Sequence, residues 1–467
     1  MKLNQIALGV AALFAAGAAS AATHTLVVSG ATALNKSFEK TVSDMCEAGT
    51  SYAYTSGSGK TSVRYECNVK DGLGISGVAD TDDLVIHKEG GGSSAGVTPV
   101  NNSATVPVAT TTCTATTSGA LIPGGPVWSK RTGCGNTTAV PHAGVSDVEP
   151  KLVGTATGNL INTGIVAQVF GIAVSDNIYQ KLQAEQGKTV GDYSEAQAPS
   201  LPIAFVRGAF SGKANDWTAL DPDITADVDR TQVANGGTEP NHVTTWDDAN
   251  ANTTAIKICR RATGSGTLAT FEATVMQNPC AGTNAYGGKL ALSTAASDDA
   301  SQSGADDSES DVYHVVEATS AEAVDTCLTR AYYQGEMAMG ILGTERLPGD
   351  AGTKTGGSDD NDGLTDKWHY VKLNQVYPSV ANFVAGDYDL FWAEASFNRR
   401  TSGYSAVETA LMNHIQAKMG SVDAITSLPL PGLAALTSNG AIFDYGVNPV
   451  SRAQKDGNTC KPSYQLY

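Results

Sequence analysis

The chain has 467 residues and is acidic, with 47 Asp and Glu against 30 Lys and Arg and a formal net charge of −17. Nucleic acids and anionic membrane surfaces require a basic footprint, so this charge argues against both as partners. It does not exclude a local anion site, because donors lining a cleft can attract an anion against the field of the whole protein.

Residues 1–22 have the parts of a secretory signal peptide. Lys2 supplies the positive charge, an apolar run follows, and Ala19-Ser20-Ala21 matches a cleavage site. The apolar run is too short to span a bilayer, and no other segment is long and apolar enough to do so. The sequence predicts a periplasmic or secreted protein whose cleavage site lacks the Cys of a lipoprotein.

Eight cysteines in an exported chain predict disulfides. Three pairs of successive cysteines have equal spacing, which predicts the bridges Cys46–Cys67, Cys113–Cys134 and Cys259–Cys280. Cys327 then remains to pair with Cys460. No C-x-x-C pair is present, which argues against a zinc or redox site.

Apolar segments that lead into glycine turns recur along the chain. A strand, a turn and a helix are predicted over residues 25–46 and again over 255–277, and a buried strand followed by a helix over 163–187. Residues 82–100 indicate a strand that runs into a Gly/Ser turn, and 336–343 indicate another buried strand. Strands that alternate with helices predict an α/β fold with mainly parallel sheets, which bind ligands at the carboxyl ends of their strands.

Two regions depart from this pattern. Residues 101–140 are rich in Thr, Gly and Pro and include Cys113 and Cys134, which predicts an inserted loop region pinned by a disulfide. Residues 297–311 contain almost no apolar side chains and predict a mobile acidic loop.

Motifs for catalysis or metal binding are incomplete. Residues 56–62 match the end of a phosphate loop, but Tyr54 stands where the first glycine is required. Residues 357–366 resemble part of a calcium loop, but His369 stands where a bidentate Glu is required. No H-E-x-x-H motif is present, and an exported hydrolase is a distant alternative. We expect a protein without enzymatic activity, cofactor or metal.

Four short turns together contain the donors of an anion site. They supply hydroxyls, backbone N–H groups, a guanidinium and one carboxylate. The candidate residues are Thr32 and Ala33 in the first turn, Ser93 in the second, Asp147 in the third, and Arg261, Ser265, Gly266 and Thr267 in the fourth. The fourth turn opens a predicted helix, whose N-terminus favours negative charge.

These turns resemble motifs of the periplasmic phosphate-binding proteins of ABC importers, which belong to the type-2 solute-binding proteins. The similar stretches are SGATALNKSFEK, GGSSAGV, GVSDVEP and RRATGSGTLATF, and residues 204–220 and 372–391 resemble two further family segments. The resemblance implies a monomer of two α/β lobes that close over inorganic phosphate or a related oxyanion and deliver it to an ABC permease.

The resemblance also implies a division of the chain. Lobe 1 would comprise residues 23–168, with the insertion at about 101–140, and lobe 2 residues 169–345. Residues 346–467 would return to lobe 1 and add a C-terminal extension. Lobe 1 would then supply Thr32, Ala33, Ser93 and Asp147, and lobe 2 would supply Arg261, Ser265, Gly266 and Thr267.

Asp147 bears on the choice of anion. A carboxylate only accepts hydrogen bonds, so it tolerates an oxyanion that carries a proton and repels fully ionised sulfate. Thr263 stands where the phosphate-binding proteins usually have an Asp that orients the Arg, and residues 56–59 compete with Ser93 for the role of the Gly-Ser loop. The alternative function is a secreted surface or matrix protein that binds a macromolecule with the same scaffold.

Overall fold

The structure is a computed structural model, and it describes most of the predicted mature chain. The described residues are 21–56, 62–121, 126–153, 158–224, 254–278, 290–291, 295–296, 313–333, 335–348, 366–427, 432–436, 450–451, 453–455, 458–460 and 464–465. Within these ranges no helix is long and apolar enough to cross a bilayer. The predicted acidic loop at 297–311 lies outside them, as does the predicted leader apart from its last two residues.

Lobe 1 is built on three parallel strands. In the sheet, β1 (Thr23–Gly30) lies between β4 (Asp83–Glu89) and β9 (Ala143–Ser146) and is parallel to both. The sheet continues from β4 through β3 (Ser62–Asn68), β2 (Tyr52–Ser56), β7 (Val127–Cys134) and β6 (Ala115–Ala120). Its helices are α2 (Asn35–Asp44), α3 (Thr98–Asn102), α10 (Ala406–Met419) and α11 (Val422–Ser427), with the 3-10 turns η1 (Ser93–Gly96) and η2 (Pro150–Val153).

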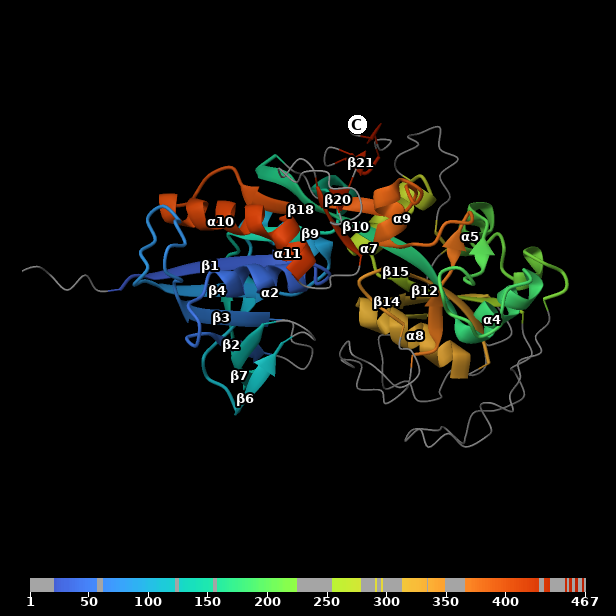
Figure 1. The fold of residues 1–467 in the computed structure, drawn as a ribbon, viewed down its shortest axis with the longest axis horizontal. Helices are drawn as coiled ribbons and strands as arrows, with labels where there is room; N and C mark the ends of the chain where they lie inside the picture. The colour runs from blue at the N-terminus through green and yellow to red at the C-terminus, as the bar shows by residue number, and fades with distance from the viewer. Residues whose placement is uncertain are drawn as a thin grey trace, which may run out of the picture.

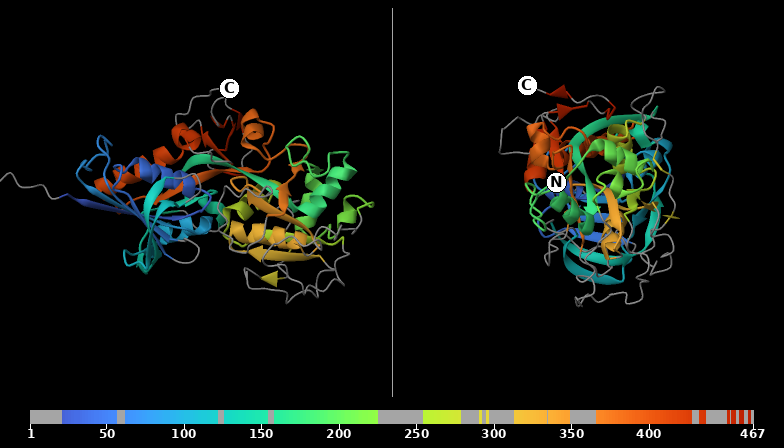
Figure 2. Two further views of the ribbon diagram at one scale, coloured as in Figure 1. Left: turned by 60° about the horizontal axis from the view of Figure 1, so that its bottom comes forward. Right: turned by 90° about the vertical axis from the view of Figure 1, so that its right-hand side faces the viewer.

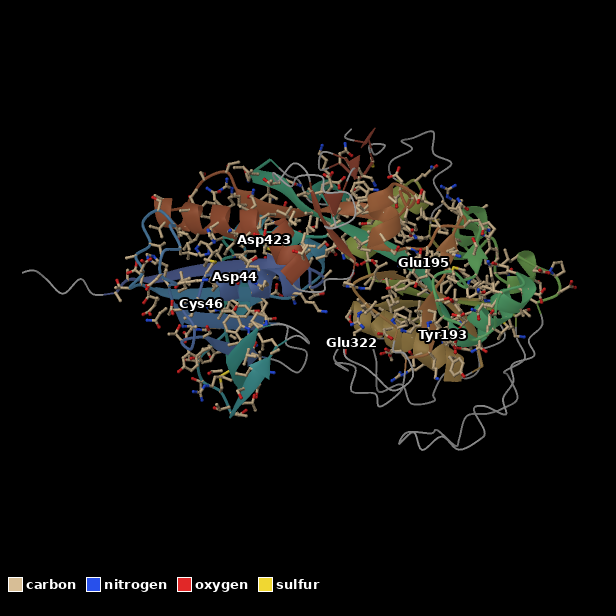
Figure 3. The ribbon with its side chains drawn as sticks, viewed as in Figure 1. Asp44, Cys46, Tyr193, Glu195, Glu322 and Asp423 are labelled. Atoms are coloured by element: carbon tan, nitrogen blue, oxygen red, sulfur yellow. A yellow bond between two sulfur atoms is a disulfide. The ribbon has the colours of Figure 1, made fainter. Side chains whose placement is uncertain are left out.

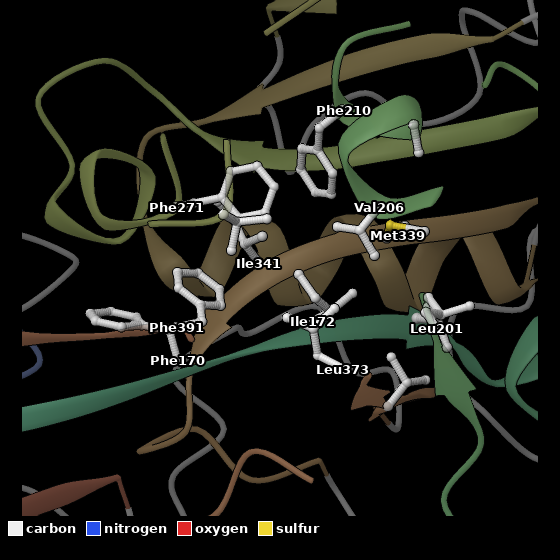
Figure 4. Close-up of a cluster of buried hydrophobic side chains, with 14 of the residues drawn as sticks. Phe170, Ile172, Leu201, Val206, Phe210, Phe271, Met339, Ile341, Leu373 and Phe391 are labelled. Carbon is white, nitrogen blue, oxygen red and sulfur yellow. The ribbon is translucent and has the colours of Figure 1, made fainter. Parts of the chain in front are cut away.

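Lobe 2 repeats this parallel arrangement. Its central strand β12 (Ile256–Arg261) is parallel to β14 (His314–Ala318) and to β15 (Met337–Gly343), and β13 (Ala295–Ala296) adds to β14. Its helical elements are α4 (Asp176–Glu185), α5 (Ile203–Phe210), η3 (Trp217–Ala219), α7 (Gly266–Thr270), the π-helical turn η5 (Phe271–Val275), α8 (Ala321–Tyr333) and α9 (Val380–Ala385). Phe210, Phe271, Phe391 and neighbouring aliphatic side chains fill its core (Figure 4).

One long strand joins the two lobes. The first part of β10 (Leu160–Ser175) pairs with β18 (Trp392–Arg400) and β19 (Leu433–Leu436), and its last part pairs with β15 and β16 (Trp368–Tyr370). The lobes therefore lie on either side of these crossing strands (Figures 1 and 2). In Figure 3, Asp44, Cys46 and Asp423 mark lobe 1, and Tyr193, Glu195 and Glu322 mark lobe 2. The remaining short strands are β11 (Ser200–Leu201), β17 (Lys372–Leu373), β20 (Val450–Ser451), β21 (Ala453–Gln454) and β22 (Tyr464–Gln465).

The predicted two-lobed α/β fold is confirmed, and so are its main local elements. Leu34, Phe38, Val42 and Met45, which recur at helical spacing, are all fully buried under α2 and its ends. Burying the apolar stripe of an amphipathic helix against a sheet is the main source of that helix's stability. The predicted lobe boundary at 168/169 falls inside β10; the boundaries themselves stay predictions.

The prediction of a loop region at 101–140 is wrong. The region forms β6 and β7, which pair with each other, and a second ribbon of β5 (Val106–Ala109) and β8 (Asn136–Ala139). Trp128 of β7 is almost fully buried, and its Nε1 donates to Oε1 of Glu39 in α2 at 2.7 Å. Threonine favours strands as well as turns, and this long-range anchor could not be inferred from the local pattern.

Two of the predicted disulfides are confirmed and two are wrong. Cys46–Cys67 and Cys113–Cys134 are bridged as predicted. Cys259 pairs with Cys327 rather than with Cys280, because β12 and α8 bring them together within lobe 2. Cys460 therefore cannot pair with Cys327, although it is disulfide-bonded, and Cys280 lies outside the described residues. Disulfides of this kind fit an oxidising compartment.

His87 makes the stability of lobe 1 dependent on pH. It lies in β4 between Val27 of β1 and Arg64 of β3, and it is only 5% exposed. Burial, together with the charge of Arg64, lowers its pKa from 6.5 to about 4. A histidine with a depressed pKa stabilises the fold above pH 6.5, and this stabilisation is lost as the pH falls towards 4.

We predict that the wild type loses about 3 kcal/mol more unfolding free energy between pH 7 and pH 4 than His87→Gln, which has no group to protonate there. Denaturant titrations at a series of pH values measure this difference. Parallel pH profiles for the two proteins would show that His87 is not buried as a neutral ring.

Candidate functional site

The carboxyl ends of β1, β4 and β9 meet at one edge of the lobe 1 sheet, as the parallel pairing requires. The Ala31 N–H donates to the Val145 carbonyl at 2.9 Å, and Ala31 also forms a bridge with Gly91. A Cβ added to Gly30 would stand 2.1 Å from the Val145 oxygen, and one added to Gly96 would stand 1.9 Å from it. Only glycine at positions 30 and 96 permits these backbones to approach Val145 so closely. The turns that follow β1, β4 and β9 are therefore in contact.

Ser93 and Asp147 form a buried pair in lobe 1. The Ser93 hydroxyl donates to Oδ2 of Asp147 at 2.9 Å, and its oxygen accepts from the Asp147 N–H at 2.9 Å. Ser93 is fully buried and Asp147 is 6% exposed. Although 54 residues separate them in sequence, the structure joins these two predicted site residues directly.

The lobe 2 turn follows β12. Arg261 ends the strand, Gly264 adopts a φ of +94°, and Ser265 precedes α7. The Nη2 of Arg261 donates to the Thr319 carbonyl at 2.8 Å. Thr263, between Arg261 and Gly264, is exposed. The Thr319 carbonyl thus orients Arg261 in this chain.

The two turns are in contact across the lobes. The Ser94 N–H of lobe 1 donates to the Gly264 carbonyl of lobe 2 at 3.0 Å. A Cβ added to Gly266 would stand 2.2 Å from the Ser93 hydroxyl oxygen and 2.6 Å from the Asp147 Cβ. The lobes are therefore closed at this point, and Gly266 has no room for a side chain.

The other predicted residues differ in their positions. Ser265 and Thr267 flank Gly266 and are buried. Thr32 is exposed and Ala33 is half-buried in the turn before α2, and within the described residues neither side chain has a hydrogen bond to the Ser93–Asp147 pair. Of the competing stretch 56–59, only Ser56 is described, and it ends β2.

The buried polar atoms that have no hydrogen bond in the described chain include Oδ1 of Asp147 and the hydroxyl of Ser265. Such atoms are rare in folded proteins and mark places where a partner is expected. Burial raises the pKa of Asp147, while the Ser93 donor and the charges of Arg261 and Lys88 oppose this rise. The site thus contains an acceptor from lobe 1 and a donor from lobe 2.

Three further charged groups near the site are missing from the sequence-based prediction. Lys88, 2% exposed, donates from Nζ to the carbonyls of Gly30 at 2.8 Å and of Glu89 at 2.9 Å. Burial lowers the pKa of Lys88 and raises that of Glu89. Burial and the charge of Asp147 raise the pKa of Glu345. In the sequence, the one signal for these charged groups is the pair Lys88-Glu89, which follows the apolar residues 84–86 at the end of a predicted strand.

The described residues include no cluster of three His, Cys, Asp or Glu side chains arranged to hold a metal ion. Nearly all of the calcium-like stretch 357–366 lies outside the described residues. The polar groups of the site are instead hydroxyls, backbone N–H groups, a guanidinium and carboxylates.

Comparisons with known proteins give similarity in structure only. No protein-family model and no curated protein matches the sequence. A candidate phosphate ABC transporter substrate-binding protein from Clostridium perfringens, solved with bound phosphate, has 12% identity and a TM-score of 0.42 over 86% of this chain and 97% of its own.

Two other solved structures are similar over a comparable length. An ABC-type phosphate transport receptor from Vibrio cholerae has 10% identity and a TM-score of 0.38 over 84% of this chain and 93% of its own. A candidate phosphate binding protein from Planctomyces limnophilus has 9% identity and a TM-score of 0.34, over 87% and 92% respectively. The chain is a two-lobed α/β protein, and its function is argued below from its own residues.

We expect Gly266→Ala to lower the unfolding free energy by about 1–3 kcal/mol, because its methyl group would overlap Ser93 and Asp147. Gly158→Ala is the matched control, since no atom lies within 4 Å of a Cβ at that position. Chemical denaturation of the two variants checks the contact. Equal stability would show that the lobes do not meet at Gly266.

Proposed function

We propose that this chain is an exported solute-binding protein that holds a small protonated oxyanion, phosphate first among them, between its two lobes. It would carry the ion unchanged to an ABC permease and act as a monomer. The observation that carries this proposal is the pair of buried atoms without hydrogen bonds, Asp147 Oδ1 from lobe 1 and the Ser265 hydroxyl from lobe 2.

The chemistry of these two atoms fits one class of ligand. Asp147 Oδ1 can accept a hydrogen bond from an O–H group, and the Ser265 hydroxyl can donate one to an oxygen atom. Hydrogen phosphate offers both a proton and free oxygens. Arg261 and Lys88 add positive charge, which opposes the rise that burial causes in the pKa of Asp147 and would also favour an anion in the low dielectric of the site.

Binding would require the lobes to separate and close again. The contact of Gly266 with Ser93 and the hydrogen bond from Ser94 to Gly264 hold the turns together. A ligand that bridges Asp147 and Ser265 would exchange part of this contact for its own hydrogen bonds. Separation and closure around a ligand is a common motion of two-domain proteins.

Equilibrium dialysis of the predicted mature chain against radiolabelled phosphate tests the proposal without depending on a binding enthalpy. We expect one phosphate per chain, and a loss of affinity of about 5- to 150-fold in Ser265→Ala, the range for an unmet buried hydrogen bond. Thr426→Val, on the exposed side of α11, is the control. Retention of no phosphate at millimolar concentration contradicts the proposal.

Asp147 predicts a pH-dependent choice between phosphate and sulfate. Because burial raises its pKa, acidification protonates the carboxyl group and converts an acceptor into a donor. Sulfate, which has no proton near neutral pH, should therefore compete better as the pH falls.

We expect Asp147→Asn to remove this pH dependence, since an amide donates at every pH, and to admit sulfate at neutral pH. Competition dialysis with sulfate at several pH values measures both effects. Asp71→Asn, an exposed position of lobe 1, is the control. Sulfate competition that is the same in wild type and Asp147→Asn at every pH would place Asp147 outside the site.

A further inference from the structure

The C-terminal segment of the chain is built into the crossing strands. β20 pairs with β19 in parallel, with Val450 opposite Ala435, and β19 pairs with β10 where that strand passes between the lobes. β20 also lies against α9 of lobe 2, and both appear beside β10 in Figure 1. We use the name strap for the described residues between 450 and 460.

Lys455 anchors the strap on β18. It is 4% exposed, although lysine is among the residues least often buried. Its N–H donates to Oε1 of Glu394 at 2.5 Å, its Nζ donates to the Trp392 carbonyl at 3.0 Å, and Nζ lies 4.3 Å from the centre of the Trp392 ring. A carbonyl and an aromatic face thus replace water around the ammonium group, while the Glu394 carboxylate holds the backbone of Lys455.

Thr459 anchors the strap on lobe 1. Its N–H donates to Oε1 of Glu149 at 2.8 Å, and its hydroxyl donates to Oε2 of the same carboxylate. Thr459 is 5% exposed and Glu149 6%, so both hydrogen bonds are shielded from water. The next residue, Cys460, is disulfide-bonded, which restrains this end of the strap further.

Glu149 belongs to the loop that carries Asp147. Between these two residues, the Val148 carbonyl accepts from the hydroxyls of Ser146 at 2.7 Å and of Ser396 in β18 at 3.0 Å. The loop is therefore held by β18 from one direction and by the strap from another. A displacement of the strap would act on the position of Asp147 through Glu149.

We propose that the strap restrains the opening of the two lobes and fixes the loop of Asp147. Separation of the lobes requires the crossing strands to bend. The strap is hydrogen-bonded to these strands and to the Asp147 loop, and β20 lies against α9 of lobe 2. Opening must therefore stretch or break buried hydrogen bonds at Lys455 or Thr459. Glu149 and Thr459 are positioning residues for Asp147. If the proposed function holds, the strap also sets the rate at which the ligand leaves.

Small-angle X-ray scattering of the full mature chain without ligand tests the restraint. We expect Thr459→Val, which keeps the side-chain shape, and the double variant Thr459→Val/Lys455→Met to have a larger radius of gyration than the wild type. Thr426→Val, on α11 away from the strap, should match the wild type. If the double variant does not fold, the radius of gyration of Thr459→Val alone tests the restraint.

The second measurement is the dissociation rate of phosphate, which should rise about tenfold or more in Thr459→Val, the factor expected from the loss of a buried hydrogen bond. A lower melting temperature with an unchanged radius of gyration would overturn the proposal, because the strap would then be only structural. Since the scattering experiment uses no ligand, its outcome is independent of whether phosphate binds at all.

Discussion

The contact of Gly266 with the Ser93–Asp147 pair is the constraint on which the rest of the site depends. It joins the end of one parallel sheet to the end of another, and a side chain at position 266 would prevent it. In lobe 1, the pair is positioned by the close approach of the backbones of Gly30, Gly96 and Val145. In lobe 2, the turn is positioned by the positive φ of Gly264 and by the hydrogen bond from Arg261 to the Thr319 carbonyl.

The electrostatics of the site differ from those of the whole chain. The protein carries a net charge of −17, yet Asp147 is surrounded by a hydroxyl donor and by the positive charges of Arg261 and Lys88. Burial makes these local groups more important than the distant surface charge, because screening by water and salt is weak there. A carboxylate among the donors would then restrict the ligands to those that bring a proton.

The local patterns of the sequence are sufficient to predict an α/β fold with mainly parallel sheets, and the resemblance to a known family adds the two lobes. Leu34, Phe38 and Val42 repeat at helical spacing, and glycine turns after apolar strands located the loops that meet at the site. The same reasoning brought Ser93, Asp147 and Gly266 into one list before any geometry was known. Parallel strands end at one edge of a sheet, whatever the length of chain between them, which is why the turns of Ser93 and Asp147 meet.

Features that depend on distant contacts could not be predicted. Equal spacing suggested Cys259–Cys280, but the bridge to Cys327 follows from the packing of α8 on β12, which has no local signal. Trp128 reaches Glu39 from an apparently loop-like stretch. The hydrogen bond from Thr459 to Glu149 spans 310 residues. The burial of Lys88 has no local signal either, because a lysine near a strand end is more often solvated than buried.

A crystal structure of the predicted mature chain grown in phosphate tests the central claim most directly. The account predicts tetrahedral density between the lobes, with one oxygen within hydrogen-bond distance of Asp147 Oδ1 and another near the Ser265 hydroxyl. Gly266 would then have moved away from Ser93 to admit the ion. Phosphate bound elsewhere, or a site in which Gly266 still touches Ser93 at saturating phosphate, would contradict it.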